Sequence, residues 1–508
     1  MNCKKWFGGI ALSAALIAGA GAPAASAYEK ASYSSQVNVQ LKEDASLSFQ
    51  LNGLFELENL TSRDRVLLLP GLTLSASSPG SRPTLTANGQ TYTANAGFRI
   101  SETKNPTSRY AKFTSDTVVR KGAGASYDAV RTLTRNEAAE YISSITSGGV
   151  VWYNIQLSDG VRGWVSSQTT LLENSPAGIS TIRYNHASYR GSAELKANGS
   201  KIRLTNSLAL EDYLKGVVPN EMPASWHIEA LKAQAIVARS YAANTMSLSS
   251  TTASQVYKGY SSETASTTKA VTDTDGIMVK YNNKPIQTFF YSTSGGRTAN
   301  VGDVWNSSQA SFPYLISVAD PYESSPHSSW RETFSSSTIL TSFGYNPSNT
   351  VLYDVKANPK GANGEIGSVT VTTSNGTKTL SGNENDIRKL FPVPAAYNML
   401  RSNWFTLSAS KGYTIQRASS SDGAYSVNGA QVMLANGSTV AVNSGTATIQ
   451  TASGTITREA DPKSIEINGK GWGHRIGMSQ YGAKGFAENG TKAEDIVRHY
   501  YPGTTVSK

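Results

Sequence analysis

The helical period of apolar positions is clearest between residues 208 and 244. Residues 208–215 predict a short helix, which Gly216 would end in the left-handed conformation. After a corner, a second helix is expected to begin near residues 223–225, since proline suits a first helical turn and serine can cap one. Arg239 lies four residues after an alanine of the buried face, so we expect its guanidinium beside that face. The apolar residues of this helix follow the three-and-four spacing of a single stripe: Ile228, Leu231, Ala235, Ala238 and Ala242.

Much of the remaining chain alternates apolar and polar residues, the pattern typical of β-strands. Residues 28–115 form a first β-rich part, and residues 351–380 predict a β-hairpin followed by a short helix at 383–390. Residues 413–462 form a β insert rich in Ser, Thr and Gly, to which the sequence assigns no role. The last helix is expected to open with a capping box at residues 491–494. Turns are expected at nine dipeptides: Pro79-Gly80, Asn88-Gly89, Asn198-Gly199, Asp275-Gly276, Asn282-Asn283, Asn363-Gly364, Asn375-Gly376, Asn428-Gly429 and Asn436-Gly437.

Residues 116–172 differ from their surroundings and predict a separate small β domain. Their short strands, their Gly-rich first loop and their two late tryptophans resemble a bacterial SH3-like domain that binds the cell wall. Tyr127, Trp152 and Trp164 are therefore expected to contact the wall. The alternative for the two tryptophans is that they form the core of a very small barrel.

The N-terminus predicts an export signal at residues 1–27. Two lysines form its basic part, an apolar run follows, and an A-x-A cleavage site ends it, so the mature chain is expected to begin at Tyr28. The alternative is an uncleaved membrane anchor; no later run is long and apolar enough to span a bilayer. The single cysteine, Cys3, leaves with the signal. A mature chain without disulfides fits the exterior of a Gram-positive bacterium.

The composition is that of a β-rich extracellular protein. Of the 508 residues, 39% are hydrophobic, which is enough for real cores, and only 16% are charged. The formal net charge is +10, or +8 without the two signal lysines, and the basic residues are scattered rather than clustered. This charge pattern argues against nucleic acid as a partner and favours a mild attraction to anionic wall polymers. The length allows about three domains.

One carboxylate stands apart from the others in the helical segment. Glu221 lies at the mouth of the second helix, whereas Glu211, Asp212 and Glu229 are predicted to be ordinary charges on the helix surface. Hydrolytic glycosidases use two carboxylates, one as acid and one as nucleophile or base. A single carboxylate suits an enzyme that breaks a glycosidic bond without a water nucleophile.

Five segments resemble the stage II sporulation protein D / LytB amidase-enhancer family: LEDYLKGVVPNEMP, EALKAQAIVARSYA, QVYKGY, YSTSGGRTANVGDVW and GWGHRIGMSQYGAKG. They follow the order of the family between residues 210 and 485. The resemblance implies a secreted or membrane-anchored protein that acts on peptidoglycan. Sporulation members are lytic transglycosylases that cut glycan strands already stripped of stem peptides, and LytB members are enhancers of a wall amidase. The motif positions imply Glu221 as the catalytic acid and Arg239 as a further site residue.

In a lytic transglycosylase, the C6 hydroxyl of muramic acid attacks its own anomeric carbon and forms a 1,6-anhydro ring. Glu221 would then act twice, protonating the leaving oxygen and afterwards taking the hydroxyl proton. The acid must be protonated near neutral pH, which Met222 and Trp226 would favour by desolvation and the helix N-terminus would oppose. The alternative is that Glu221 only complements the helix dipole. Arg239 would steady substrate oxygens or orient Glu221, and its alternative is a salt bridge.

Two Gly-rich loops are the remaining candidates for substrate contact. The loop at residues 292–298 would let a polymer approach its backbone, and the loop around His474 matches the loop that the family places at its cleft. The alternatives are a tight structural turn and a structural histidine. Arg475 stands where the family usually has glycine. The residues expected to contact substrate are Trp226, Ser294, Gly295, Gly296, His474 and Tyr481.

No metal and no cofactor are predicted. Some sporulation members hold zinc with Cys and His just before the QVY motif, and residues 249–257 offer neither. The predicted architecture is α+β: a β-rich, multi-domain secreted protein with a helical catalytic core. Its parts are a signal peptide (1–27), an N-terminal β-rich part (28–115), an SH3-like β-barrel insert (116–172) and a catalytic domain (176–508) interrupted by the insert at 413–462.

The expected function is lytic cleavage of MurNAc–GlcNAc linkages in wall remodelling or sporulation, with glycan strands as the partner. Two alternatives stay open. One is a non-enzymatic enhancer of an N-acetylmuramoyl-L-alanine amidase, for which that cell-wall amidase would be a partner. The other is a structural wall-binding protein.

Overall fold

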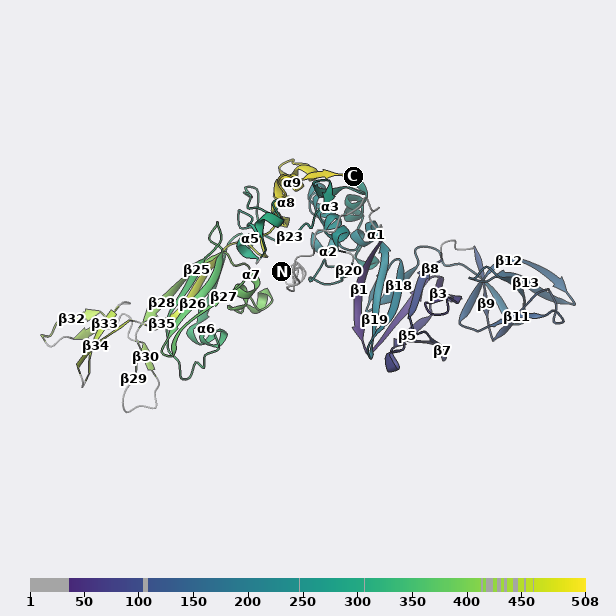
Figure 1. Cartoon of the computed structure of the whole chain (residues 1–508), viewed down its shortest axis with the longest axis horizontal. Helices are drawn as coiled ribbons and strands as arrows, with labels where there is room; N and C mark the ends of the chain where they lie inside the picture. The colour runs from purple at the N-terminus through teal and green to yellow at the C-terminus, as the bar shows by residue number, and fades with distance from the viewer. Residues whose placement is uncertain are drawn as a thin grey trace, which may run out of the picture. The chain divides into compact units, whose positions relative to one another are not determined.

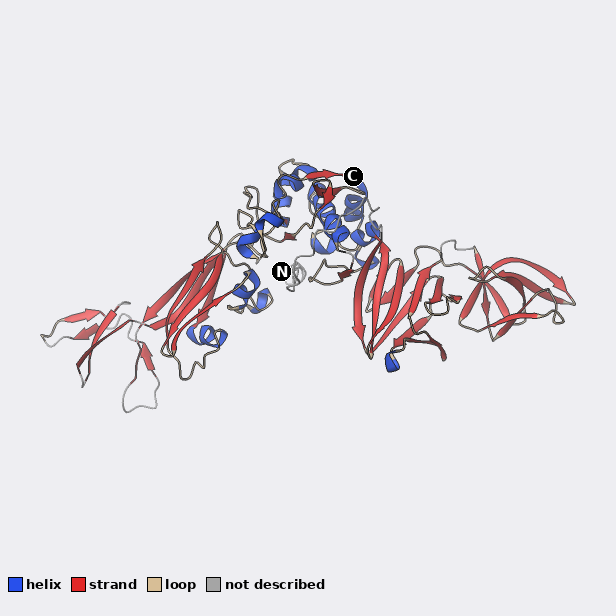
Figure 2. Cartoon of the chain, in the orientation of Figure 1, coloured by secondary structure: helices blue, strands red, loops and turns tan. Residues whose placement is uncertain are grey.

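The structure, a computed structural model, describes residues 36–103, 108–245, 247–305, 307–412 and 461–508, together with short segments between 413 and 460. The predicted signal peptide and the Asn428-Gly429 turn lie outside the described residues. The chain divides into two compact units, Met1–Gln287 with Ser507–Lys508, and Thr288–Val506. Strands dominate both units, and most helices follow the first β region (Figures 1 and 2).

The first unit contains a β-sandwich of two sheets. One sheet of the sandwich is part of a 14-stranded sheet and has the strand order β4-β3-β8-β18-β19-β1-β20. The other sheet has the order β17-β16-β2-β5-β6-β7. The early strands are β1 (Gln36–Asp44), β2 (Ser46–Asn52), β3 (Phe55–Asn59), β4 (Arg65–Leu68), β5 (Thr73–Ser77), β6 (Thr84–Ala87), β7 (Gln90–Thr93) and β8 (Phe98–Glu102). The later strands are β16 (Thr181–Tyr184), β17 (Ala187–Tyr189), β18 (Ser192–Asn198), β19 (Lys201–Ala209) and β20 (Ser247–Ser249).

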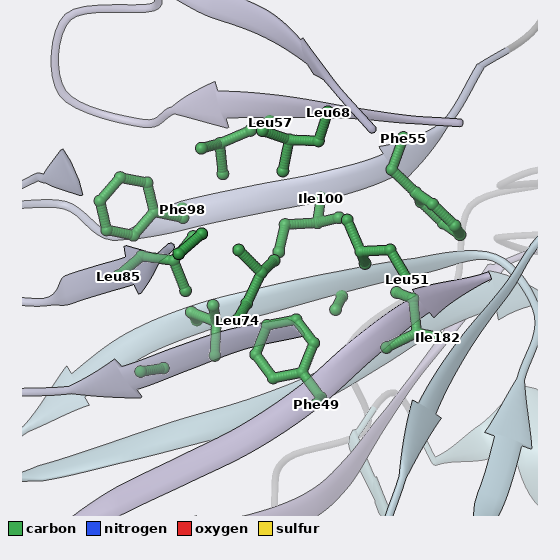
Figure 3. Packing of buried hydrophobic residues seen from close by; sticks show 14 of the residues in the cluster. Phe49, Leu51, Phe55, Leu57, Leu68, Leu74, Leu85, Phe98, Ile100 and Ile182 are labelled. Carbon is green, nitrogen blue, oxygen red and sulfur yellow. The ribbon is translucent and has the colours of Figure 1, made fainter. Parts of the chain in front are cut away.

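The sandwich core follows from strand alternation. In β2, Leu47, Phe49 and Leu51 point inward, while Ser48 and Gln50 between them point to the other face. They belong to one buried cluster with Phe98 of β8 and Ile182 of β16. Figure 3 shows Phe49, Leu51, Phe98 and Ile182 in this core. The core therefore combines strands that precede the SH3-like segment in the sequence with strands that follow it. The predicted domains 28–115 and 176–508 thus each contribute strands to this one sandwich.

The SH3-like module is longer than residues 116–172. Its strands are β9 (Arg109–Phe113), β10 (Thr117–Arg120), β11 (Ala129–Leu133), β12 (Glu137–Ser147), β13 (Val150–Gln156), β14 (Arg162–Ser166) and β15 (Thr170–Asn174). β9 pairs with both β12 and β15, so the module begins before residue 116. β12 also pairs with β4 of the sandwich, and the Asn136 side chain donates to the Ala87 carbonyl at 2.7 Å. The module is thus continuous with the sandwich sheet.

Four helices follow β19 and carry the acidic segment. They are α1 (Leu210–Lys215), α2 (Val218–Glu221), α3 (Ile228–Asn244) and α4 (Ala265–Asp273), followed by β21 (Met278–Tyr281) and β22 (Lys284–Pro285). The second long helix begins at Ile228 with His227 as its N-cap, so the predicted start near residues 223–225 is wrong. α3 is buried nearly all round rather than along one stripe.

Gly216 does not end α1 in the left-handed conformation, because its φ is −88°. Its lack of a side chain matters for space instead. A Cβ at Gly216 would lie 2.7 Å from the ring of Tyr257 and 3.1 Å from the carbonyl oxygen of Gly259. The glycine therefore allows the QVYKGY segment to pack against the end of α1.

The second unit combines small sheets with short helices. Its sheets are β24-β35-β28, β25-β26-β27 and the parallel pair β23-β36. Its strands are β23 (Phe290–Tyr291), β24 (Trp330–Ser335), β25 (Leu352–Pro359), β26 (Ile366–Thr373), β27 (Gly376–Ser381), β28 (Phe405–Gly412), β35 (Asp461–Gly469) and β36 (Met478–Ser479). Its helices are α5 (Val301–Val304), α6 (Ser336–Ser342), α7 (Glu384–Lys389), α8 (Gln480–Glu488) and α9 (Ala493–Tyr500); the chain ends after β37 (Thr505–Ser507).

Some local predictions in this unit are confirmed and one is wrong. The hairpin of β25 and β26 and the short helix α7 are confirmed, and Asn383 caps α7 in a complete capping box. The capping box at residues 491–494 is wrong, since α9 begins after Lys492 without a side-chain cap. The 413–462 insert leaves from the ends of the paired strands β28 and β35, and its described residues form three antiparallel strand pairs.

Candidate active site

Glu221 is the last residue of α2, a single turn that fills the corner between α1 and α3. Proline in its first turn favours the start of this turn, and extended backbone at Met222 ends it. Glu221 is only 2% exposed, and the backbone N–H of Val256 donates to its Oε1 at 2.8 Å. The sequence placed this carboxylate at the mouth of a helix; the structure places it inside, against a loop 35 residues further on.

The QVYKGY segment holds the Val256 N–H in place. The Tyr213 hydroxyl donates to the Gln255 side-chain oxygen at 3.1 Å, and the Gln255 amide donates to the Ala238 carbonyl at 3.3 Å. The Tyr257 ring lies 5.1 Å from the Tyr213 ring, and its hydroxyl donates to Asn206 at 2.8 Å. The sequence analysis quoted this motif but assigned no site residue to it. Its spacing to Glu221 carries no local signal that would have revealed the contact.

Two tyrosines lie in the electrostatic field of Glu221. Burial, and then the charge of Glu221, raises the pKa of Tyr213 well above its ordinary value. Burial is also the main cause that raises the pKa of Tyr241, with the Glu221 charge contributing. Both phenols therefore stay neutral, and two buried aromatic side chains lie near Glu221.

Arg239 is fully buried and pairs with Glu211. Its Nε and Nη2 donate to the two carboxylate oxygens of Glu211 at 2.7 Å each. The same guanidinium donates to the carbonyls of Val271 at 3.2 Å and Ile277 at 3.1 Å. These contacts tie α1, α3 and the end of α4 together, which matches the salt-bridge alternative for Arg239. The expectation that Glu211 is an ordinary surface charge is wrong.

Glu229 is also not an outward-facing surface charge. It is 9% exposed, and Lys232 pairs with it at 3.2 Å. Two acidic residues of the helical segment, Glu211 and Glu229, are therefore committed to cations. Asp212 is the more exposed member of a pair with Lys215 at 2.7 Å.

The surface beside α2 offers an aromatic ring that the sequence analysis missed. Tyr260, the last residue of the QVYKGY motif, is 39% exposed, and the Arg190 guanidinium lies 4.6 Å from its ring centre. Glu263 fixes that guanidinium through two hydrogen bonds of 2.7 Å. Asn220 donates to Ser262 in the same loop at 2.9 Å. Trp226 is half-buried just before α3.

The Ser294-Gly295-Gly296 turn belongs to the second unit and is held by a carboxylate. The backbone N–H groups of Ser294 and Gly295 donate to Glu323, the latter at 2.9 Å. Gly295 has a φ of +77°, and a Cβ there would lie 2.8 Å from the backbone nitrogen of Gly471. The two Gly-rich loops thus pack backbone against backbone. For Ser294 and Gly295, these contacts match the alternative of a tight structural turn. A Cβ at Gly296 would meet open space.

His474 is a packing residue in this unit. It is 1% exposed, and its ring centre lies 5.3 Å from that of Tyr291 and 5.1 Å from that of Trp305. Burial lowers its pKa to about 3, so the imidazole is neutral. The burial matches the structural alternative for His474. Tyr481, at the start of α8, is half-buried, and its N–H donates to the Ser292 carbonyl at 3.0 Å.

Arg475 adopts a φ of +64°, the left-handed region that favours glycine. Its guanidinium is buried, pairs with the buried Glu365 at 3.0 Å and donates to the Ser294 carbonyl at 2.9 Å. Its central carbon lies 4.0 Å from the Trp404 ring centre. The side chain thus supplies contacts that a glycine at this position would lack.

A buried carboxylate lies beside the same loops. Burial, and then the neighbouring Glu323 charge, raises the pKa of Asp320 to about 6. The Tyr500 hydroxyl donates to it at 2.8 Å. A Cβ at Gly482 would lie 2.2 Å from the Asp320 carboxylate, so the glycine of the MSQYGA segment makes room for it.

The three aromatic residues of the SH3-like module differ in accessibility. Tyr127 is 52% exposed and packs over Gly122, where a Cβ would lie 2.5 Å from the ring. Trp164 is half-buried. Trp152 is 7% exposed, so the expectation that its ring faces the wall is wrong and its core alternative fits.

Within the described ranges, no three or more His, Cys, Asp or Glu side chains are grouped so that they could hold a metal ion. Of the helices that the structure describes, none combines the length and apolar character needed to cross a bilayer.

Comparison with known proteins finds two families. The model described as "Stage II sporulation protein" matches residues 198–281, which include α1 to α4, and a bacterial SH3 domain matches residues 115–170. The amidase enhancer of Bacillus subtilis (strain 168) is 34% identical over 303 residues, 58% of this chain but only 40% of the relative. Stage II sporulation protein D of Bacillus subtilis (strain 168) is 29% identical over 378 residues, covering 68% of this chain and 86% of the relative. Its counterpart in Bacillus amyloliquefaciens is 30% identical over 329 residues, covering 59% and 75%.

Proposed function

Because the chain belongs to the stage II sporulation protein D family of sporulation and cell-wall proteins, we propose that it is a peptidoglycan lytic transglycosylase that uses Glu221. It would act outside the cell, on MurNAc–GlcNAc linkages of glycan strands. The observation that carries the proposal is the position of Glu221: buried, within the matched family segment, with one oxygen bonded to the Val256 N–H.

The proposed reaction needs one carboxylate. Glu221 protonates the glycosidic oxygen, the C6 hydroxyl of the same muramic acid forms the new bond to the anomeric carbon, and Glu221 takes the hydroxyl proton. The Val256 N–H fixes the rotation of the carboxyl group, because it can only donate and so bonds to an unprotonated oxygen in either state. The ion pairs of Glu211 and Glu229 support this assignment, since both groups are occupied elsewhere.

Tyr260 is proposed to be a substrate platform beside Glu221. Its exposed ring is braced from one side by Arg190, and its loop is bonded to the α2 turn through Asn220 and Ser262. Aromatic rings provide apolar contact area with well-defined geometry. Arg239 is assigned a structural role, since it holds α1 and α4 against α3, the helix that follows Glu221.

The second candidate is enhancement of an amidase without catalysis. It is favoured by the 34% identity to a protein named amidase enhancer. In this role the SH3-like module would hold the chain on the wall, with Tyr127 as its exposed aromatic contact.

Product analysis separates the two functions. The purified chain is incubated with intact and with peptide-stripped glycan strands, and mass spectrometry scores 1,6-anhydro ends against reducing ends. Anhydro ends support the proposal, and reducing ends would mean hydrolysis with a second carboxylate. No release from either substrate, together with faster digestion by an added amidase, would favour the enhancer.

A further inference from the structure

A groove of about 720 Å³ in the second unit has no part in the site described above. Trp330 and Trp404 line it, and its rim carries the exposed polar residues Thr406, Asn468 and Lys470. Aromatic side chains together with a few polar groups are typical of a site that binds a small molecule or a polymer segment.

Trp404 is held rigidly in this groove. Its indole N–H donates to the Asn363 carbonyl at 2.8 Å, and the Arg475 guanidinium lies 4.0 Å from its ring centre. Arg475 is itself fixed by Glu365 and by the Ser294 carbonyl. The ring therefore cannot turn without breaking its hydrogen bond to Asn363 and its contact with the buried Arg475 guanidinium. The Trp404 ring is half-exposed and lines the groove. It therefore forms a preformed apolar platform.

Trp330 forms another part of the lining. Its indole N–H donates to the Gly471 carbonyl at 2.8 Å. The backbone of Gly469 lies directly on its ring, because a Cβ there would be 2.1 Å from the ring carbons. Glycine at this position allows the strand to lie close to the indole.

The rim supplies one available positive charge. Lys470 is exposed, its ammonium lies 5.1 Å from the Trp404 ring centre, and no carboxylate in the described part of the chain pairs with it. Arg331, the other cation of the groove, is paired with Glu466. Asn468 and Thr406 add an amide and a hydroxyl beside the platform.

We infer that this groove binds a carboxylate-bearing aminosugar strand, with a sugar face on Trp404 and a muramic acid carboxylate on Lys470. This inference rests on the proposed function and adds a glycan subsite built from residues of the second unit. The aromatic platform favours a sugar ring over a polyol phosphate polymer, which offers little apolar face and would need more than one free cation. Binding replaces the contact between Lys470 and the ring with an ion pair to the carboxylate.

The test measures binding to the full chain carrying Glu221→Gln, so that cleavage does not interfere. The probes are a labelled peptide-free GlcNAc–MurNAc octasaccharide, a neutral GlcNAc octamer and poly(glycerol phosphate). Trp404→Leu should weaken both sugar probes roughly fivefold, since aromatic contacts contribute on the order of 1 kcal/mol and 1.4 kcal/mol is tenfold. Lys470→Gln should weaken only the muramic probe. Tyr397→Ala, at an exposed aromatic residue outside the groove, is the matched control.

Unchanged affinity of the muramic probe in Lys470→Gln would overturn the inference, and this exposed variant does not put the fold at risk. So would equal weakening by Tyr397→Ala, or tighter binding of poly(glycerol phosphate) than of the sugars. Failure of the proposed function has a different signature. In that case the parent forms no anhydro ends while the Trp404 and Lys470 effects on binding persist.

Discussion

Replacing Arg239 by methionine tests whether this residue supports the fold or the chemistry. Methionine keeps an unbranched apolar stem but is shorter than arginine, and it removes the charge and every donor. The Glu211 carboxylate then loses two hydrogen bonds of 2.7 Å, and the carbonyls of Val271 and Ile277 each lose this donor. The helices α1, α3 and α4 lose their common polar contact.

The magnitude follows from burial on each side of the pair. Arg239 is 0% exposed and the Glu211 side chain is 30% exposed. Removing one partner of a buried pair costs about 3–5 kcal/mol, because the other charge is left uncompensated. Glu211 can turn toward water, so we expect Arg239→Met to cost roughly 2–4 kcal/mol. Glu211→Gln strands the buried guanidinium and should cost about 3–5 kcal/mol.

Urea unfolding and the rate of anhydro-end formation are measured on the same preparations. Lys269→Met is the matched control, because its pair with Asp273 at 2.9 Å lies on the surface and should contribute less than about 1 kcal/mol. Both pair variants should lose stability, and activity should fall only with the folded fraction. An Arg239→Met protein as stable as the parent but inactive would refute this reasoning and return Arg239 to the chemistry.

The remaining predictions concern pH, metal and the wall. Because the pKa of Asp320 is raised to about 6, the folded chain binds one more proton than the unfolded chain between about pH 4 and 6. The free energy of unfolding should therefore fall by up to about 3 kcal/mol as pH rises through that window. Urea unfolding of Asp320→Asn should no longer show this fall. The pKa of His474 is lowered to about 3, so the unfolded chain takes up a proton before the folded chain does as pH falls below 6.5. The free energy of unfolding should therefore decrease between pH 6.5 and pH 3. In His474→Asn, this decrease should be smaller. A chelator should leave activity and melting temperature unchanged, and stoichiometric zinc in protein purified without added metal would contradict this. Tyr127→Ala should weaken sedimentation with isolated walls while Trp152→Phe leaves it unchanged, since only Tyr127 is exposed; equal effects would contradict the assignment.

Turns could be predicted because their signals lie within a few residues. At every predicted turn dipeptide in the described residues, the second residue has positive φ, as at Gly89, Asn283 and Gly364. Caps were not predicted: the structure has a capping box at Asn383 that the sequence analysis did not identify, and the one expected at residues 491–494 is wrong. The start of α3 was predicted too early. α3 begins at Ile228, and the separate turn α2 precedes it.

Contacts between distant segments could not be predicted. The Arg239–Glu211 pair spans 28 residues and the Val256–Glu221 contact spans 35, and neither has a periodic pattern behind it. The same limit explains the domain boundaries. β9 and β15 bracket the SH3-like module through pairing, and the sandwich closes only when β18 meets β8 across the whole module. Burial of Trp152 likewise depends on its neighbours in space.

The most direct test of the central claim is Glu221→Gln, which keeps the shape of the side chain and the bond from Val256 but removes the transferable proton. Asp212→Asn, at a partly exposed helix charge, is its matched control. On peptide-stripped strands, anhydro ends should fall by on the order of 10² to 10⁴-fold in Glu221→Gln, the range that general acid–base catalysis contributes. Binding to walls should persist, and the control should match the parent. Anhydro ends formed by Glu221→Gln at the parent's rate would contradict the account.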